Sequence, residues 1–107
     1  MKKNLFIFTF LLGVFSLSAQ AQKQEKTITI EVQNNWNQAK ADAPVVINLH
    51  ELHAGFKVKS AVVMEGTKEI PSQLDDLNRD RKMDELVFVT DLPAHGRKIF
   101  QVTLSSE

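Results

Sequence analysis

The sequence contains no cysteine and only four glycines in its 107 residues. Without cysteine, the chain cannot form disulfide bonds, thiolate zinc sites or a cysteine nucleophile. The few glycines do not form a glycine-rich phosphate-binding loop. Basic and acidic residues balance at 13 each, so no basic excess is present to attract nucleic acid or an anionic membrane. These absences exclude several functional classes before any motif is considered.

The first 21 residues have the pattern of a secretory signal peptide. Two lysines precede a mostly apolar run over residues 5–17, and Ala19-Gln20-Ala21 fits the small-x-small cleavage rule. This run is about 13 residues, whereas a membrane-spanning helix needs roughly 20. An uncleaved anchor or an amphipathic helix is the alternative, although no stop-transfer flank follows. We expect a periplasmic or secreted protein of residues 22–107, with no membrane contact after cleavage.

Beyond the signal peptide, apolar residues recur with the period of two that is typical of β-strands. Residues 27–32 alternate cleanly, so Ile28, Ile30 and Val32 should face a core while Glu31 and the threonines face water. A stretch rich in turn-forming residues follows and ends at Pro44, after which residues 45–49 read as a short buried strand.

Three further segments complete the predicted sheets. Residues 56–64, whose first half alternates with lysines, form a hairpin with residues 68–74, in which Pro71 makes the second arm an edge strand or ends it early. Residues 85–92 and 98–104 flank a turn at 93–96. In the last of these strands, alternation places Phe100, Val102 and Leu104 on one face.

The predicted fold class is therefore all-β, a small antiparallel β-sandwich or open barrel of six to seven strands. A domain of 86 residues buries only about 60 to 65 per cent of the surface of its unfolded chain. Such a domain is marginally stable without help from a metal, a partner or more chain.

Residues 76–84 carry oxygen-bearing groups at alternate positions. Counting Asp76 as position 1 puts Asn78 at 3, Asp80 at 5, the carbonyl of Lys82 at 7 and Asp84 at 9. This is the spacing with which a calcium loop surrounds one ion. Calcium prefers six to eight oxygens at about 2.3 to 2.6 Å, which alternate residues of a tight loop can direct at one centre. The spacing predicts a structural calcium site.

A solvated charged turn is the alternative interpretation of the same residues. Position 6, where a glycine normally makes the sharp turn, is Arg81, and a positive φ at a non-glycine residue costs about 1 to 2 kcal/mol. Arg79, Arg81 and Lys82 could also neutralise the carboxylates in salt bridges that contribute little. The sequence leaves both interpretations open.

Other candidate residues carry weaker signals. His50 and His53 have a spacing that could serve one metal on a helical turn, but they lack a third ligand and read more simply as surface histidines. Trp36 is either a carbohydrate-binding platform for a sugar ring or a side chain packed over a sheet edge. Asp84 and Glu85, as strand neighbours, point to opposite faces and cannot flank one glycosidic bond. No catalytic set is recognisable.

Two stretches, residues 41–49 and 59–104, resemble the amino-terminal part of the domain of unknown function 4861 family, and the resemblance covers residues 27–104. The family pattern Gln-x-Asp-Asp-x-Asp-x-Asp-Gly, followed by Asp-Glu-Leu, is matched here by Gln73, Asp75, Asp76, Asn78, Asp80, Asp84, Glu85 and Leu86. Asn78 stands for an aspartate, and Arg81 replaces the glycine. The resemblance implies an exported bacterial protein linked to polysaccharide utilisation. Because family members are several times longer, it also implies that the chain is an amino-terminal fragment.

Two functions follow as expectations. The first is an exported non-catalytic β-sandwich module that supports a carbohydrate-active protein, with a missing carboxy-terminal domain or a carbohydrate-active protein as its partner and a polysaccharide as its ligand. The second is a fragment of a polysaccharide-processing lyase or hydrolase whose catalytic residues lie beyond Glu107. The lack of a plausible acid and base pair favours the first. Calcium is the only cofactor expected, and nucleic acid is not expected as a partner.

Overall fold

The computed structural model describes residues 22–107, and the predicted signal peptide lies outside these described residues. The described chain forms seven strands and one short 3-10 helix. In chain order they are β1 (Glu25–Gln33), β2 (Lys40–Asn48), η2 (Leu49–Leu52), β3 (Ser60–Glu65), β4 (Lys68–Ile70), β5 (Ser72–Asp75), β6 (Glu85–Leu92) and β7 (Arg97–Ser105). Within residues 22–107, no helix has the length and hydrophobicity needed to cross a lipid bilayer.

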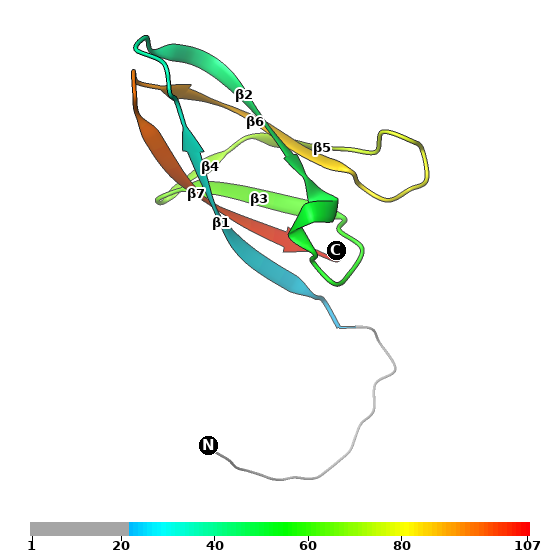
Figure 1. Cartoon of the computed structure of the whole chain (residues 1–107). Helices are drawn as coiled ribbons and strands as arrows, with labels where there is room; N and C mark the ends of the chain where they lie inside the picture. The colour runs from blue at the N-terminus through cyan, green and yellow to red at the C-terminus, as the bar shows by residue number, and fades with distance from the viewer. Residues whose placement is uncertain (1–21) are drawn as a thin grey trace, which may run out of the picture.

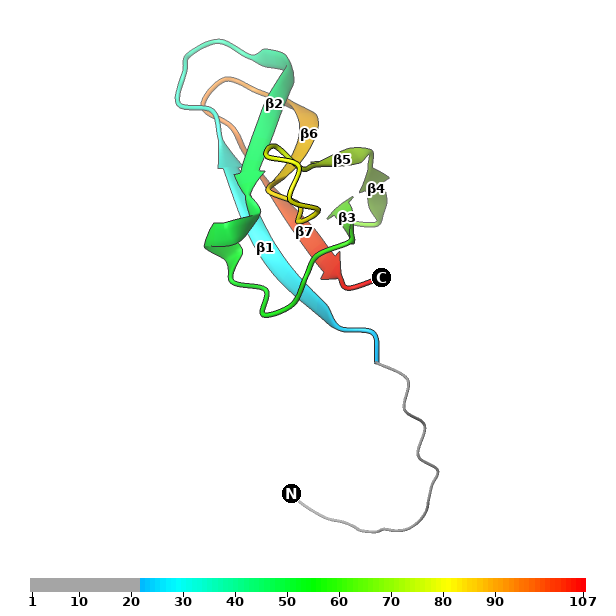
Figure 2. The same ribbon diagram turned by 90° about the vertical axis from the view of Figure 1, so that its right-hand side faces the viewer.

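The strands form two antiparallel sheets that face each other (Figure 1). One sheet has the order β1-β7-β3-β4 and the other β2-β6-β5, and in the view turned by 90° β2 of the second sheet crosses over β1 and β7 of the first (Figure 2). The predicted all-β sandwich is therefore confirmed. The chain passes from one sheet to the other between β4 and β5, at Pro71. Proline has no backbone N–H to donate to a neighbouring strand, and at this position no hydrogen bond of a central strand is lost. β4 and β5 are both edge strands, so the second arm of the predicted hairpin is an edge, as predicted, and it is divided at Pro71 between the two sheets.

The core lies between the sheets and is built mainly by the central strands β6 and β7. On β7 the alternation places Phe100, Val102 and Leu104 in the core, all fully buried as predicted, and on β6 it places Leu86 and Phe88 there. The rings of Phe88 and Phe100 meet edge to face with centroids 4.9 Å apart, an arrangement that adds about 0.5 to 1.5 kcal/mol beyond the buried area. This contact joins the two sheets.

The outer strands β1 and β2 are less well covered than the central ones. Ile28, Ile30 and Val32 point inward from β1 as predicted, yet each is only half-buried, and so are Val45 and Ile47 of β2. Both strands are edges of their sheets, with a hydrogen-bonded neighbour on one side only. The sandwich is therefore tight at its centre and more open along this side.

Two strand boundaries differ from the prediction. β2 begins at Lys40 and contains Pro44, because an edge strand tolerates a proline, and its register shifts between Lys40 and Ala43. β3 begins only at Ser60, so the alternation around Val58 belongs to a loop that still buries that side chain. Within β3, Val63 faces the core and Val62 faces outward.

Adjacent valines on β3 provide a test of this register. Val63 is fully buried, whereas Val62 is 40 per cent exposed. Val63→Ala should therefore lower the free energy of unfolding by about 2 kcal/mol, through lost burial and a cavity. Val62→Ala makes the same chemical change and should cost less than about 0.5 kcal/mol. Urea denaturation of both variants measures the difference, and equal losses would contradict the register.

Candidate metal centre in the β5–β6 loop

The loop of residues 76–84 joins β5 to β6 at one end of the molecule (Figure 1). The two strands close it, because Asp75 pairs with Glu85 in the ladder. One further backbone bond, from Asp84 N–H to the Asp75 carbonyl at 2.8 Å, tightens its base. The loop is thus fixed at both ends by the sheet.

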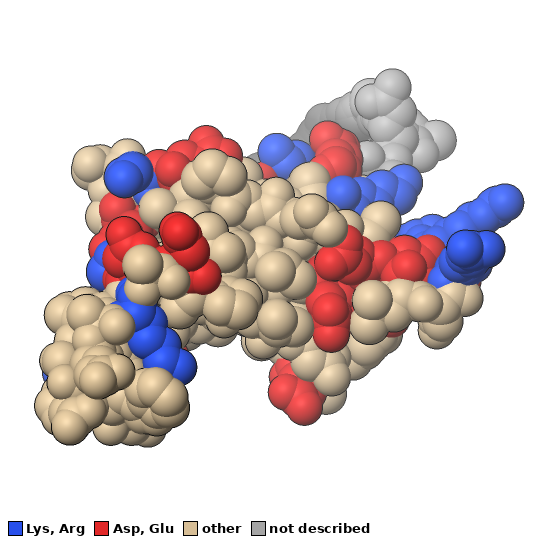
Figure 3. All heavy atoms as spheres, turned by 90° about the horizontal axis from the view of Figure 1, so that it is seen from above, with Lys and Arg blue, Asp and Glu red and all other residues tan. Residues whose placement is uncertain are grey.

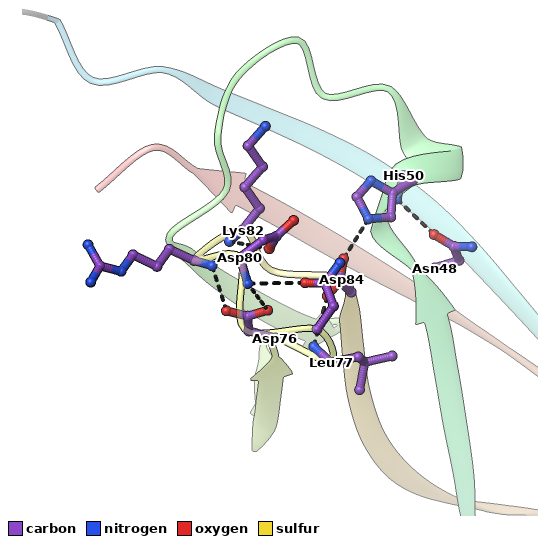
Figure 4. A network of polar contacts seen from close by, with 9 residues as sticks. Asn48, His50, Asp76, Leu77, Asp80, Lys82 and Asp84 are labelled. Atoms are coloured by element: carbon purple, nitrogen blue, oxygen red, sulfur yellow. Dashed lines mark hydrogen bonds and ion pairs between the residues drawn. The ribbon is translucent and has the colours of Figure 1, made fainter.

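Three of the predicted ligands converge within this loop. One carboxylate oxygen from each of Asp76, Asp80 and Asp84 lies within 4.8 Å of the other two, and Figure 4 shows these side chains turned toward one another. Ligand oxygens 2.3 to 2.6 Å from a calcium ion are at most about 5 Å apart. The spacing of the three oxygens is therefore compatible with one shared cation.

Side chains of the loop also hold its backbone. Asp76 accepts the N–H of Arg81 at 2.8 Å and that of Asp80 at 3.3 Å. Asn78 accepts the Asp80 N–H at 3.2 Å, and Asp80 accepts the Lys82 N–H at 2.9 Å (Figure 4). A carboxylate has about four acceptor positions, so these bonds leave capacity for a metal. The same hydrogen bonds bend the backbone of the loop around the carboxylates.

Two arginines of the loop adopt left-handed backbone conformations. Arg79 has a φ of 62° and Arg81 a φ of 68°. Arg81 occupies position 6 and takes the conformation for which a glycine is usually selected, at a cost of about 1 to 2 kcal/mol. The chain thus turns sharply at position 6 although no glycine stands there.

Asp84 is the best-anchored residue of the group. Besides its bond to Asp75, its carbonyl accepts the Leu49 N–H at 3.0 Å. Its carboxylate accepts the Leu77 N–H at 2.8 Å and lies 2.7 Å from His50 Nε2 (Figure 4). These contacts tie the loop to β5 and to η2, which belongs to another part of the chain. The buried Asp84 is therefore held in place, while its carboxylate keeps acceptor positions beyond these two contacts.

The environment of Asp84 favours its ionised form. The hydrogen bond from His50 is the main cause that lowers the pKa of Asp84 below its ordinary value of 3.8, and the bond from Leu77 N–H adds to it. Burial acts in the opposite direction, but the hydrogen bonds outweigh it. The residue is therefore a carboxylate at neutral pH.

The sequence did not predict the role of His50. It lies 34 residues from Asp84, and the two meet because Asn48 pairs with Glu85 when β2 lies beside β6. Asn48 also accepts the His50 N–H and starts η2. The sequence alone does not show that β2 pairs with β6, and without this pairing the contact between His50 and Asp84 could not be predicted.

The other candidates lie apart from this centre. His53 ends η2 with a φ of 49°, and its carbonyl accepts a bond from Lys26 Nζ at 3.0 Å. Trp36 lies in the connection between β1 and β2, 60 per cent exposed, with Lys40 Nζ 4.5 Å from its ring centroid. Of the His-x-x-His pair, His50 therefore contacts one of the three aspartates, Asp84, whereas His53 is not part of the group that converges there.

Charge is unevenly distributed around the loop. The view from above shows acidic side chains at both ends of the molecule, and at the end that carries the β5–β6 loop basic side chains project beyond them (Figure 3). Among the described residues, none of the ion pairs within 4.0 Å joins Arg79, Arg81 or Lys82 to an acid. The basic residues of the loop therefore do not neutralise the carboxylates by direct contact.

Most of the chain, including this loop, matches one known protein family. Residues 32–107 match the family described as Domain of unknown function (DUF4861). The chain belongs to the DUF4861 family. The match takes in β2 to β7, the whole aspartate loop and η2, so the DUF4861 region contains every residue of the candidate centre. No curated protein matches the chain.

The lowered pKa of Asp84 predicts a pH-dependent contribution to stability. A group whose folded pKa is depressed stabilises the fold above its unfolded pKa, and this contribution is lost as the pH falls through the folded value. The difference in free energy of unfolding between wild type and Asp84→Asn should therefore be largest near neutral pH and shrink below about pH 4.

Urea denaturation between pH 7 and pH 2.5, with a chelator present, would measure this difference. Glu69→Gln removes an exposed carboxylate on β4 and serves as the control, for which we expect little change across the same range. A difference for Asp84→Asn that stays constant to the lowest pH would contradict the hydrogen-bonded carboxylate.

Proposed function

We propose that this DUF4861 chain is an exported, non-catalytic β-sandwich module that supports a carbohydrate-active protein and is stabilised by one calcium ion in the β5–β6 loop. The convergence of Asp76, Asp80 and Asp84 is the observation that carries the proposal. Export follows from the signal pattern of residues 1–21.

Electrostatics supports a cation at this position. Three carboxylates whose oxygens lie within 4.8 Å of one another carry like charges that repel. The hydrogen bonds to backbone N–H groups offset part of this repulsion. A calcium ion would remove the repulsion and take the remaining oxygens as ligands. Asn78 and the Lys82 carbonyl would complete the set.

Trp36 supports the carbohydrate part of the proposal. An exposed indole presents an apolar face to the C–H groups of a sugar ring, and this ring is 60 per cent exposed. A pocket of about 320 Å³ lies beside it, bordered by Asn35, Lys40 and Pro44. Amide and ammonium groups next to an aromatic ring can donate hydrogen bonds to sugar hydroxyls.

Calcium should raise the melting temperature of the protein. At a concentration one hundred times the dissociation constant, linkage adds about 2.7 kcal/mol, which in a domain of this size corresponds to about 10 °C or more. Differential scanning calorimetry with a chelator and then with millimolar calcium measures the shift. Magnesium should give a smaller one, because it demands octahedral geometry and retains water.

Variants of the loop sharpen this test. Asp80→Ala should abolish the rise, while Glu69→Ala, an exposed acidic residue on β4, should leave it unchanged. Arg81→Gly should raise the melting temperature already in chelator, because the strain at a φ of 68° is relieved, and should increase the calcium-dependent rise because a nearby positive charge is removed. Identical melting curves with chelator and with calcium would support the charged-turn interpretation instead.

Trp36 is the only tryptophan of the chain, so its fluorescence reports directly on carbohydrate binding. Titration with soluble plant and algal polysaccharides should change the intensity or wavelength of emission, with a dissociation constant in the micromolar to millimolar range, as for small exposed sites. Trp36→Phe, which keeps an aromatic face, should retain part of the binding in calorimetry, and Trp36→Ala should lose it. Equal binding by the Trp36→Ala variant would exclude this platform.

A further inference from the structure

A pocket of about 330 Å³ lies beside the aspartate loop, and both His50 and Lys82 line it. It is bounded by η2, by the segment that leads from η2 to β3, and by the end of the β5–β6 loop. Figure 4 shows that the Lys82 side chain extends from the loop toward this connecting segment and that His50 lies at the side of η2. Three separate parts of the chain thus enclose one space.

The floor of this pocket is apolar and belongs to the core. Leu49 and Val58 are buried members of the core cluster, and Phe56 and Met83 pack against it partly exposed. Such a surface is held in place by the packing of the sandwich. It offers a fixed apolar wall to a ligand.

The remaining side chains that line the pocket are mostly basic. They are His50, His53, Lys57 and Lys82, and among the described residues that line it none is acidic. Two acidic residues lie next to the pocket without lining it: Asp84 contacts His50 Nε2, and Asp80 accepts the Lys82 backbone N–H. The Asp84 bond orients the imidazole so that its second nitrogen, Nδ1, remains to meet a ligand. The rim therefore presents cationic and hydrogen-bonding groups above an apolar floor.

We infer that this pocket binds a small organic anion, a carboxylate attached to an apolar group about the size of one ring. The volume lies at the lower end of the range for small-molecule sites, about 300 to 1,000 Å³. An apolar part would cover Phe56 and Met83, while the carboxylate would meet Lys57, Lys82 and His50. Charge complementarity selects the anion, since an amine would face only groups of like charge or donors. This site does not require a metal in the loop.

A matched series of probes tests the inference on the full chain in the presence of a chelator. The probes are 3-phenylpropionate, the neutral 3-phenylpropan-1-ol, the cationic 3-phenylpropylamine and acetate, which has no apolar ring. Amide chemical shifts in nuclear magnetic resonance report where each one binds. The carboxylate should shift residues 49–58 and 82–83 and bind about tenfold more tightly than the alcohol. The amine and acetate should bind more weakly still.

Three variants locate the charge that is responsible. Lys57→Gln and Lys82→Gln should each weaken binding of 3-phenylpropionate about two- to fivefold. Lys59→Gln removes a neighbouring lysine that does not line the pocket, so it should leave the affinity unchanged. Equal affinity for the carboxylate and the alcohol, shifts confined to other residues, or an equal loss in Lys59→Gln would each overturn the inference. The probe comparison on the wild-type chain decides the matter even where a variant is poorly folded.

Discussion

The packing of β6 against β7 across the interior is the interaction on which the other features of the molecule depend. These strands are central in their sheets, supply most of the fully buried side chains and meet through Phe88 and Phe100. The outer strands add surface that is only half-buried, as expected where a short chain has few strands to cover its core. Leu86, fully buried two residues after Asp84, fixes the start of β6. The aspartate loop therefore ends at a central strand whose first core residue is fully buried.

Asp84 links this strand to the loop. Its backbone and carboxylate together make four hydrogen bonds, to β5, to the loop itself and to η2. The loop in turn contains two unfavourable features, left-handed arginines and carboxylates of like charge close together. Such features persist where the surrounding structure determines them, and they are common at ligand sites. A bound cation would reduce the second cost, and the anchoring of Asp84 reduces the entropy that a ligand would have to remove.

Much of the fold could be predicted from the sequence because alternation is a local signal. The strands around Ile30, Leu86 and Phe100 were predicted within a few residues, since one face of each is apolar and the other polar. The starts of β2 and β3 were missed, because an edge strand can contain Pro44 and a buried Val58 can lie in a loop. The aspartates were likewise predictable, being close in sequence. His50 was not, because its contact with Asp84 depends on which strands pair.

Two residues, Lys82 and His50, connect the loop with the pocket, and this gives the charges of the two sites a common physical basis. Lys82 and His50 each contact an aspartate of the loop with one group and line the pocket with another. A cation between the aspartates would cancel the negative potential that these carboxylates exert on the pocket, and an anion in the pocket would then meet a more positive rim. Coupling of this kind is reciprocal, so an anion that bound more tightly with the cation present would raise the affinity for the cation by the same factor. Asp84 is anchored through β6 to the core, belongs to the aspartate group and contacts His50 of the pocket. Through this one residue, the stability of the fold would be linked to ligand binding at both sites.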